Sequence, residues 1–94
     1  MKTPRINRAE AEVIALKALG FLASDPERLS RFLTLSGVDL ADIATVAESP
    51  DFLAGLLNHL LQDESLLLTF TAEQELDPRV PALAADALAG WNGA

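Results

Sequence analysis

Apolar residues recur along this chain at intervals of three and four positions, which is the spacing of one face of an α-helix. In the first such segment they form a wide stripe that contains Val13, Ile14, Leu16, Ala18, Gly20, Phe21 and Leu22. The strict alternation of apolar and polar residues that marks a β-strand is not sustained anywhere in the sequence. The pattern therefore predicts an all-α protein, folded as a single compact bundle of five or six short helices.

Residues that can cap helices divide this pattern into segments. Three dipeptides, Asp25-Pro26, Ser49-Pro50 and Asp77-Pro78, combine a side-chain acceptor for free amide groups with a proline that is tolerated in the first turn. Further starts are indicated at Asn7, which can form a capping box with Glu10, and at Asp39 and Asp63. The predicted helices span residues 8–23, 26–36, 40–47, 50–62, 64–75 and 78–89.

Helix ends and helix surroundings can also be predicted. Gly37 and Gly90 lie where a left-handed residue commonly terminates a helix. The predicted helix at residues 64–75 is apolar on most sides of its first half. We therefore expect this helix to be central and covered by several neighbours.

An internal echo links the two halves of the chain. When the sequence is aligned with itself at an offset of 38 residues, identical or similar residues coincide. The pairs are Asp25 and Asp63, Leu29 and Leu67, Phe32 and Phe70, Val38 and Leu76, and Asp39 and Asp77. One interpretation is two copies of a three-helix unit, packed face to face, each supplying half of the core. The other is chance, because any two capped amphipathic helices share such a pattern.

Length and composition restrict the classes of protein. The 94 residues fit one helical domain at residues 7–91, between a flexible N-terminal tail at 1–6 and a C-terminal tail at 92–94. The net charge of -7 argues against direct nucleic-acid binding, which needs clustered basic residues. The absence of cysteine excludes disulfides and thiolate chemistry and fits a cytoplasmic protein. Polar residues interrupt the apolar stretch at 52–70, so we expect no membrane span.

His59 is the only histidine and the first candidate for chemistry. With Asp63 four residues later, it could be a base oriented by a carboxylate or one of two metal ligands. Alternatively, it is a surface or partly buried histidine near a helix C-terminus, whose dipole favours the cationic form. We favour the second interpretation and expect no catalytic residue, no metal, no cofactor and no enzymatic activity.

Three further residues are candidates for interactions. Arg28 and Arg31 lie three apart on one predicted helix and could form a small anion-binding patch, although ion pairs with Asp25 or Glu27 are the favoured interpretation. Trp91 follows the last predicted helix, where it is either a binding anchor or, as we favour, a cover folded back over the bundle.

The apolar content exceeds what a small bundle needs. Half of the residues are hydrophobic, and the mean hydropathy of +0.24 is high for a domain of this size. Either the helices pack into an unusually complete core, or apolar side chains remain exposed and mark a contact surface.

Three sequence segments resemble a known family. These are "ALGFLASDPERLSRFL", "SGVD" and "LLQDESLLLTF", and the resemblance extends over roughly residues 8 to 90. They resemble a family of small all-helical alphaproteobacterial proteins known as domain of unknown function 3572. The resemblance implies no catalytic or binding residue. Its members often carry glycine before the last "LDP", where this chain has Glu75, so we expect a different cap at that helix end.

Together these observations favour a cytoplasmic, non-catalytic interaction or adaptor module. It would pack an apolar helix face against an unknown protein partner or a second copy in a homodimer. A second hypothesis is an acidic regulator that mimics nucleic acid on a basic protein surface. A small hydrolase-like or metal site around His59 ranks last.

Overall fold

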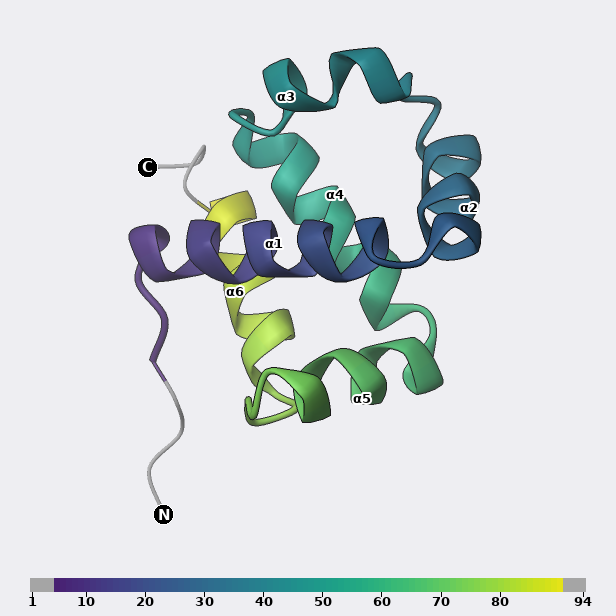
Figure 1. The fold of residues 1–94 in the computed structure, drawn as a ribbon. Coiled ribbons are helices and arrows are strands. Elements are labelled where there is room, and N and C mark those ends of the chain that lie inside the picture. Colours follow the sequence, from purple (N-terminus) through teal and green to yellow (C-terminus); the bar gives the residue numbers. More distant parts are fainter. Residues whose placement is uncertain (1–4, 91–94) are drawn as a thin grey trace.

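The computed structural model describes residues 5–90, which fold entirely into helices and their connections (Figure 1). The elements in chain order are α1 (Arg8–Ala23), α2 (Pro26–Ser36), the 3-10 helix η1 (Leu40–Asp42), α3 (Ile43–Val46), α4 (Pro50–Leu61), α5 (Glu64–Glu73) and α6 (Val80–Gly90). No strand is present between residues 5 and 90. The predicted all-α fold is confirmed.

Most of the predicted helix starts are capped as expected. Asn7 and Glu10 form the capping box, since Asn7 Oδ1 accepts the Glu10 N–H at 2.8 Å and Glu10 Oε1 accepts the Asn7 N–H at 3.2 Å. Asp25, Ser49 and Asp63 accept backbone N–H groups in the first turns of α2, α4 and α5. These local hydrogen bonds satisfy amide groups that the helices cannot satisfy themselves, so they fix where each helix begins.

Two predicted segments differ from the structure. The segment at 40–47 is split into η1 and the single turn of α3, and α6 begins at Val80, after a turn, and not directly behind Asp77. Asp77 Oδ1 accepts the N–H of Arg79 at 2.8 Å, which holds that turn. Gly37 has the expected left-handed conformation at φ 75°, whereas Gly90 is the last helical residue of α6.

The end of α5 is closed by a left-handed residue that is not glycine. Glu75 has φ 54°, and the N–H of Leu76 donates to the carbonyl of Thr71 at 2.8 Å. The Glu75 N–H also donates to the carbonyl of Ala72 at 3.3 Å. These two bonds define a Schellman cap. This chain thus forms at Glu75 the turn that favours glycine without having one, and the expectation of a cap that differs from that of the family's members stays a prediction.

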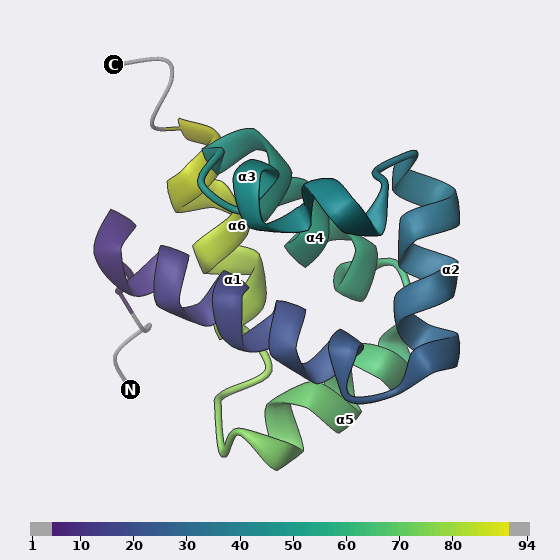
Figure 2. The ribbon, with the colours of Figure 1, turned by 45° about the horizontal axis from the view of Figure 1, so that its top comes forward.

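The core is built by α1, α4 and α6, which pack against one another in pairs, while α2 and α5 lie at the edges (Figure 2). Its fully buried side chains include Leu22, Leu56, Leu57, Leu60, Phe70 and Leu88. α5 packs chiefly against α4 and buries only Phe70 and Thr71, and its Leu68 is 45% exposed. The prediction that this helix is central is wrong, because its apolar residues are spread around it: Leu66 and Leu67 are partly buried against the core, and Leu68 points to solvent.

The internal echo is visible in the packing of two helix pairs. The ring centroids of Phe21 and Phe70 lie 5.4 Å apart, and those of His59 and Phe32 lie 5.2 Å apart. At the 38-residue offset, position 21 corresponds to position 59 and position 32 to position 70. The contact between Phe21 and Phe70 is therefore equivalent to the contact between His59 and Phe32. The pairs α1–α2 and α4–α5 are thus structurally equivalent in this respect. The third helices are not, because α6 lies in the core whereas α3 packs mainly against η1, so the two units do not supply equal halves.

Candidate functional site

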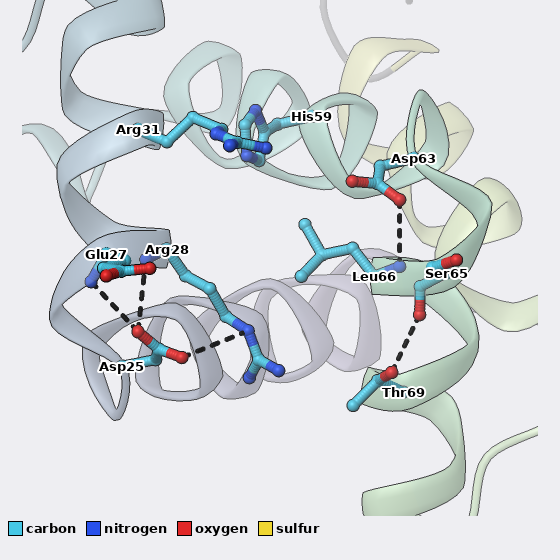
Figure 3. Close-up of a pocket in the computed structure, with 9 residues that line it drawn as sticks. All are labelled: Asp25, Glu27, Arg28, Arg31, His59, Asp63, Ser65, Leu66 and Thr69. Atoms are coloured by element: carbon cyan, nitrogen blue, oxygen red, sulfur yellow. Dashed lines mark hydrogen bonds and ion pairs between the residues drawn. The ribbon is translucent and has the colours of Figure 1, made fainter.

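Three of the four candidate residues from the sequence line one cleft. The cleft has a volume of ≈ 330 Å³ and lies between α2, the end of α4 and the start of α5 (Figure 3). Its lining residues are Asp25, Glu27, Arg28, Arg31, His59, Asp63, Ser65, Leu66 and Thr69. The fourth candidate, Trp91, lies outside the described residues. The fold thus brings together Arg28 and Arg31 from one helix pair and His59 from the other.

His59 lies on α4 with its ring edge-on to Phe32. Burial lowers the pKa of His59 below its ordinary value, with Arg31 acting in the same direction and Asp63 opposing. The favoured interpretation, a partly buried histidine in the last turn of a helix, is confirmed, but burial opposes the cationic form expected there. Asp63 does not orient the imidazole, since no hydrogen bond between them is found in the described chain and Asp63 Oδ1 accepts the Leu66 N–H at 3.1 Å.

The two arginines differ in how they are held. Arg28 Nε lies 3.7 Å from Asp25 Oδ2, and its guanidinium lies 4.6 Å from the centre of the Phe21 ring. The expected ion pair is therefore confirmed for Arg28. Arg31 is exposed, reaches from α2 toward His59 (Figure 3), and has no ion pair among residues 5–90. One guanidinium of the cleft is thus available to a ligand.

The cleft walls correspond to each other through the 38-residue offset. Asp25 and Asp63 are equivalent caps, whereas Glu27, Arg28 and Arg31 are matched by the uncharged Ser65, Leu66 and Thr69. One wall is therefore charged and the other carries hydroxyl and apolar groups. Three carboxylates and two guanidinium groups share this small space, so the cleft is not selective for one sign of charge.

The described residues show neither an oriented histidine nor a cluster of metal ligands in the cleft. A nucleophile or base is normally oriented by a second group, but no carboxylate is hydrogen-bonded to the imidazole of His59 within the described part. Residues 5–90 also contain no group of three or more His, Cys, Asp or Glu side chains that could hold a metal ion.

A second candidate surface lies on the solvent side of α1. Val13 is 51% exposed and Leu16 is 48% exposed. Ala9, Gly20 and Ala23 are also exposed, and all five residues lie along one side of the helix. We call these five residues the outer face of α1. The opposite side buries Ala11, Ile14, Ala15, Ala18, Phe21 and Leu22.

The outer face was not recognisable in the sequence as a separate surface. The apolar pattern of α1 combines Val13 and Leu16 with Ile14 and Phe21 in one wide stripe, as expected for a helix covered on that whole side. In the structure α4 and α6 cover only half of the stripe. The sequence signal that could have separated the halves is the spacing of Ala9, Val13, Leu16, Gly20 and Ala23, which alternates between four and three residues.

Exposed apolar side chains also occur elsewhere. Leu35 at the end of α2 is 71% exposed, Leu40 in η1 is 61% exposed, and Leu68 on α5 is 45% exposed. These three belong to different elements, so none of them continues into a stripe along one helix. No helix in the described chain is both long and apolar enough to cross a lipid bilayer.

Comparison with known proteins identifies a family without an assigned function. A family model described as "Protein of unknown function (DUF3572)" matches residues 8–91. No curated protein matches the chain, and no solved structure matches it. The match covers all the elements that form the core and the cleft.

Proposed function

This chain belongs to the family described as "Protein of unknown function (DUF3572)", and we propose that it is a non-catalytic interaction module that binds a protein through the outer face of α1. The observation that carries this proposal is the exposure of Val13 and Leu16, at 51% and 48%, on a helix whose other side already fills the core. A contiguous exposed apolar surface on a small protein commonly marks a contact with another molecule.

The packing inside the domain supports the same conclusion. The buried side of α1 has its full set of core contacts with α4 and α6, so Val13 and Leu16 do not contribute to the core. At their exposed fractions they add apolar surface to water without a compensating gain for the isolated domain. A partner that covers Val13 and Leu16 removes their apolar surface from water, and this burial favours binding.

The test compares two matched substitutions in a tagged protein used to capture partners from cell extract. Leu16→Glu places a charge on the outer face of α1, and Leu68→Glu places the same charge at a similarly exposed leucine on α5. We expect the wild type and Leu68→Glu to retain the same partner and Leu16→Glu to lose it. Equal retention by all three proteins, or equal loss by both variants, would refute the proposal.

The acidic surface supports a second candidate, a nucleic-acid mimic that binds a basic protein. The chain has 14 acidic and 7 basic residues, and most of its carboxylates in the described part are exposed. Salt separates the two candidates, because binding between charged surfaces weakens steeply as ionic strength rises. Binding through the outer face of α1 is expected to weaken much less between low and moderate salt, because its central contacts are apolar.

A further inference from the structure

We propose that the occupant of the outer face of α1 is a second copy of this chain, which pairs its own α1 in the antiparallel direction. This inference rests on the proposed function, since it names the partner of the same surface. It is argued from the spacing of the exposed apolar residues, from the charges beside them and from the small residues among them.

The outer face has the spacing of a two-helix contact. Its residues follow one another at intervals of four, three, four and three positions, which is the heptad alternation that keeps two helices in register. The stripe extends along the whole of α1 and contains no charged or hydrogen-bonding side chain. A partner that fits it best is therefore another straight helix with an apolar stripe of the same period.

The charges beside the stripe complement each other when α1 meets its own copy. Glu10 and Lys17 lie on the same flank of the outer face, seven residues apart and opposite in charge. In an antiparallel pair, equivalent flanks face each other, so Glu10 lies near Lys17 of the second copy and Lys17 near its Glu10. A two-fold axis thus forms two favourable ion pairs from one helix sequence.

The parallel direction is less well served. It would place Lys17 near Glu12 of the second copy, on the other flank. Glu12 already forms an ion pair with Arg8, whose Nε lies 3.2 Å from Glu12 Oε1. Lys17 has no ion pair within residues 5–90, and its charge is therefore available for Glu10. The antiparallel pairing uses the lysine without disturbing this ion pair, and Glu10, whose Oε1 accepts the Asn7 N–H in the capping box, would meet Lys17 with its second carboxylate oxygen.

The sizes of the residues also match in the antiparallel direction. Val13 faces Leu16 of the second copy on each side of the two-fold axis, and Ala9 faces Gly20. Gly20 is not required by packing within the chain, because a Cβ added there would meet no atom within 4 Å. Small residues at both ends of the stripe let the two helix backbones approach closely around the central valine and leucine pairs.

The contact is small, so the dimer is expected to be reversible. One 16-residue helix is about 24 Å long, and two such helices bury less than the roughly 1,200 Å² of a standard interface. We expect dissociation in the micromolar range or weaker. Sedimentation velocity between micromolar and millimolar protein concentrations measures this equilibrium directly.

Charge reversals test the pairing. Glu10→Lys and Lys17→Glu each turn both ion pairs into like-charge contacts, and each is expected to raise the dissociation constant about tenfold. An equimolar mixture of the two variants recovers both ion pairs in a heterodimer and is expected to associate as strongly as the wild type. Glu48→Lys, a charge reversal at an exposed residue in the turn before α4, is the control and leaves the dimer unchanged. Glu10→Lys also removes the capping-box hydrogen bond to Asn7, whereas Lys17→Glu removes no side-chain hydrogen bond found within residues 5–90, so agreement between the two variants assigns the loss of association to the ion pairs. Circular dichroism verifies that each variant remains folded.

Three results would overturn the inference. A wild-type protein that stays monomeric at all concentrations excludes the second copy as the occupant. A dimer unaffected by Glu10→Lys excludes the antiparallel pairing, and a mixture that does not recover association excludes the ion pairs. The proposed function has its own readout, because loss of a different captured protein by Leu16→Glu, with a monomeric wild type, would refute only the inference.

Discussion

Replacing Glu75 by glycine is expected to stabilise this protein. Glu75 adopts φ 54° at the end of α5, in the left-handed region that side chains with a Cβ disfavour. It is exposed, and no hydrogen bond or ion pair of its side chain is found within residues 5–90. Glycine would keep the two backbone hydrogen bonds of the Schellman cap and would remove the steric conflict of the Cβ atom.

The size of the effect follows from two opposing contributions. A left-handed residue with a Cβ costs about 1–2 kcal/mol relative to the right-handed region. Glycine loses more conformational freedom on folding, which offsets about 0.5–1 kcal/mol of that gain. The net increase in the free energy of unfolding is about 0.5–1 kcal/mol. For a domain of this length, 1 kcal/mol corresponds to an increase of about 4–8 °C in the melting temperature.

Thermal and urea unfolding measure this difference, and Glu73→Gly is the matched control. Glu73 is the last residue of α5 and is also exposed, so its replacement removes the same charge near the same helix end. There the conformation is right-handed, and glycine is expected to lower the stability by about 0.5–1 kcal/mol. Opposite signs for the two variants support the conformational argument. An unchanged or less stable Glu75→Gly protein would refute it, as would stabilisation by both.

Three further predictions concern α4, the turn before α6 and the cleft. Gly55→Ala is expected to raise the free energy of unfolding by about 0.5–1 kcal/mol in urea titrations, because Gly55 is exposed within α4 and an added Cβ meets no atom within 4 Å. Arg79 lowers the pKa of Asp77 from its ordinary 3.8 to about 2, so the stabilising ion pair is present above pH 3.8 and is lost as the pH falls through about 2. Asp77→Asn should therefore lower the melting temperature at pH 7 and lose its effect in acid, and a pH-independent difference would contradict this. The pKa of His59 is lowered by burial, so protonation opposes folding and stability should fall as the pH drops below 6.5; His59→Phe should remove this dependence.

The helices could be predicted well because their boundaries depend on local chemistry. Asn7, Asp25, Ser49 and Asp63 accept hydrogen bonds from amide groups two or three residues away, and such contacts are readable in sequence. The start of α6 was misplaced for the opposite reason. Asp77 can hold either a helix start or a turn, and the choice depends on how α6 packs against α1 and α4.

The burial of individual helices could not be predicted, because it depends on long-range packing. The first half of α5 carries Leu66, Leu67, Leu68 and Phe70, yet only Phe70 is fully buried. The sequence of α6 is rich in alanine, and this helix lies in the core. α6 packs against both α1 and α4 and buries Ala84, Ala85 and Leu88 between them, whereas α5 packs chiefly against α4 alone. Counting apolar residues therefore misidentified the central helix.

The candidate residues of the cleft could be named from sequence, but their arrangement could not. Arg28, Arg31 and His59 stood out as a pair of basic residues and a single histidine. Their convergence results from the packing of α1–α2 against α4–α5, which also places Phe21 against Phe70 and His59 against Phe32. The 38-residue offset could have predicted that His59 packs against an aromatic ring, since it makes His59 the counterpart of the buried Phe21.

Both α1 and α4 keep one side in water, and the residues on those sides differ in chemistry. On α4 the exposed residues Asp51, Gly55 and Asn58 follow one another at intervals of four and three positions, and two of the three are polar. Through the 38-residue offset Asp51 corresponds to Val13 and Asn58 to Gly20, which are exposed on α1. The fold therefore exposes equivalent positions of the two helices. What distinguishes the outer face of α1 is that apolar residues stand where α4 has polar ones, and an exposed apolar stripe of this kind is the one that a second α1 can cover.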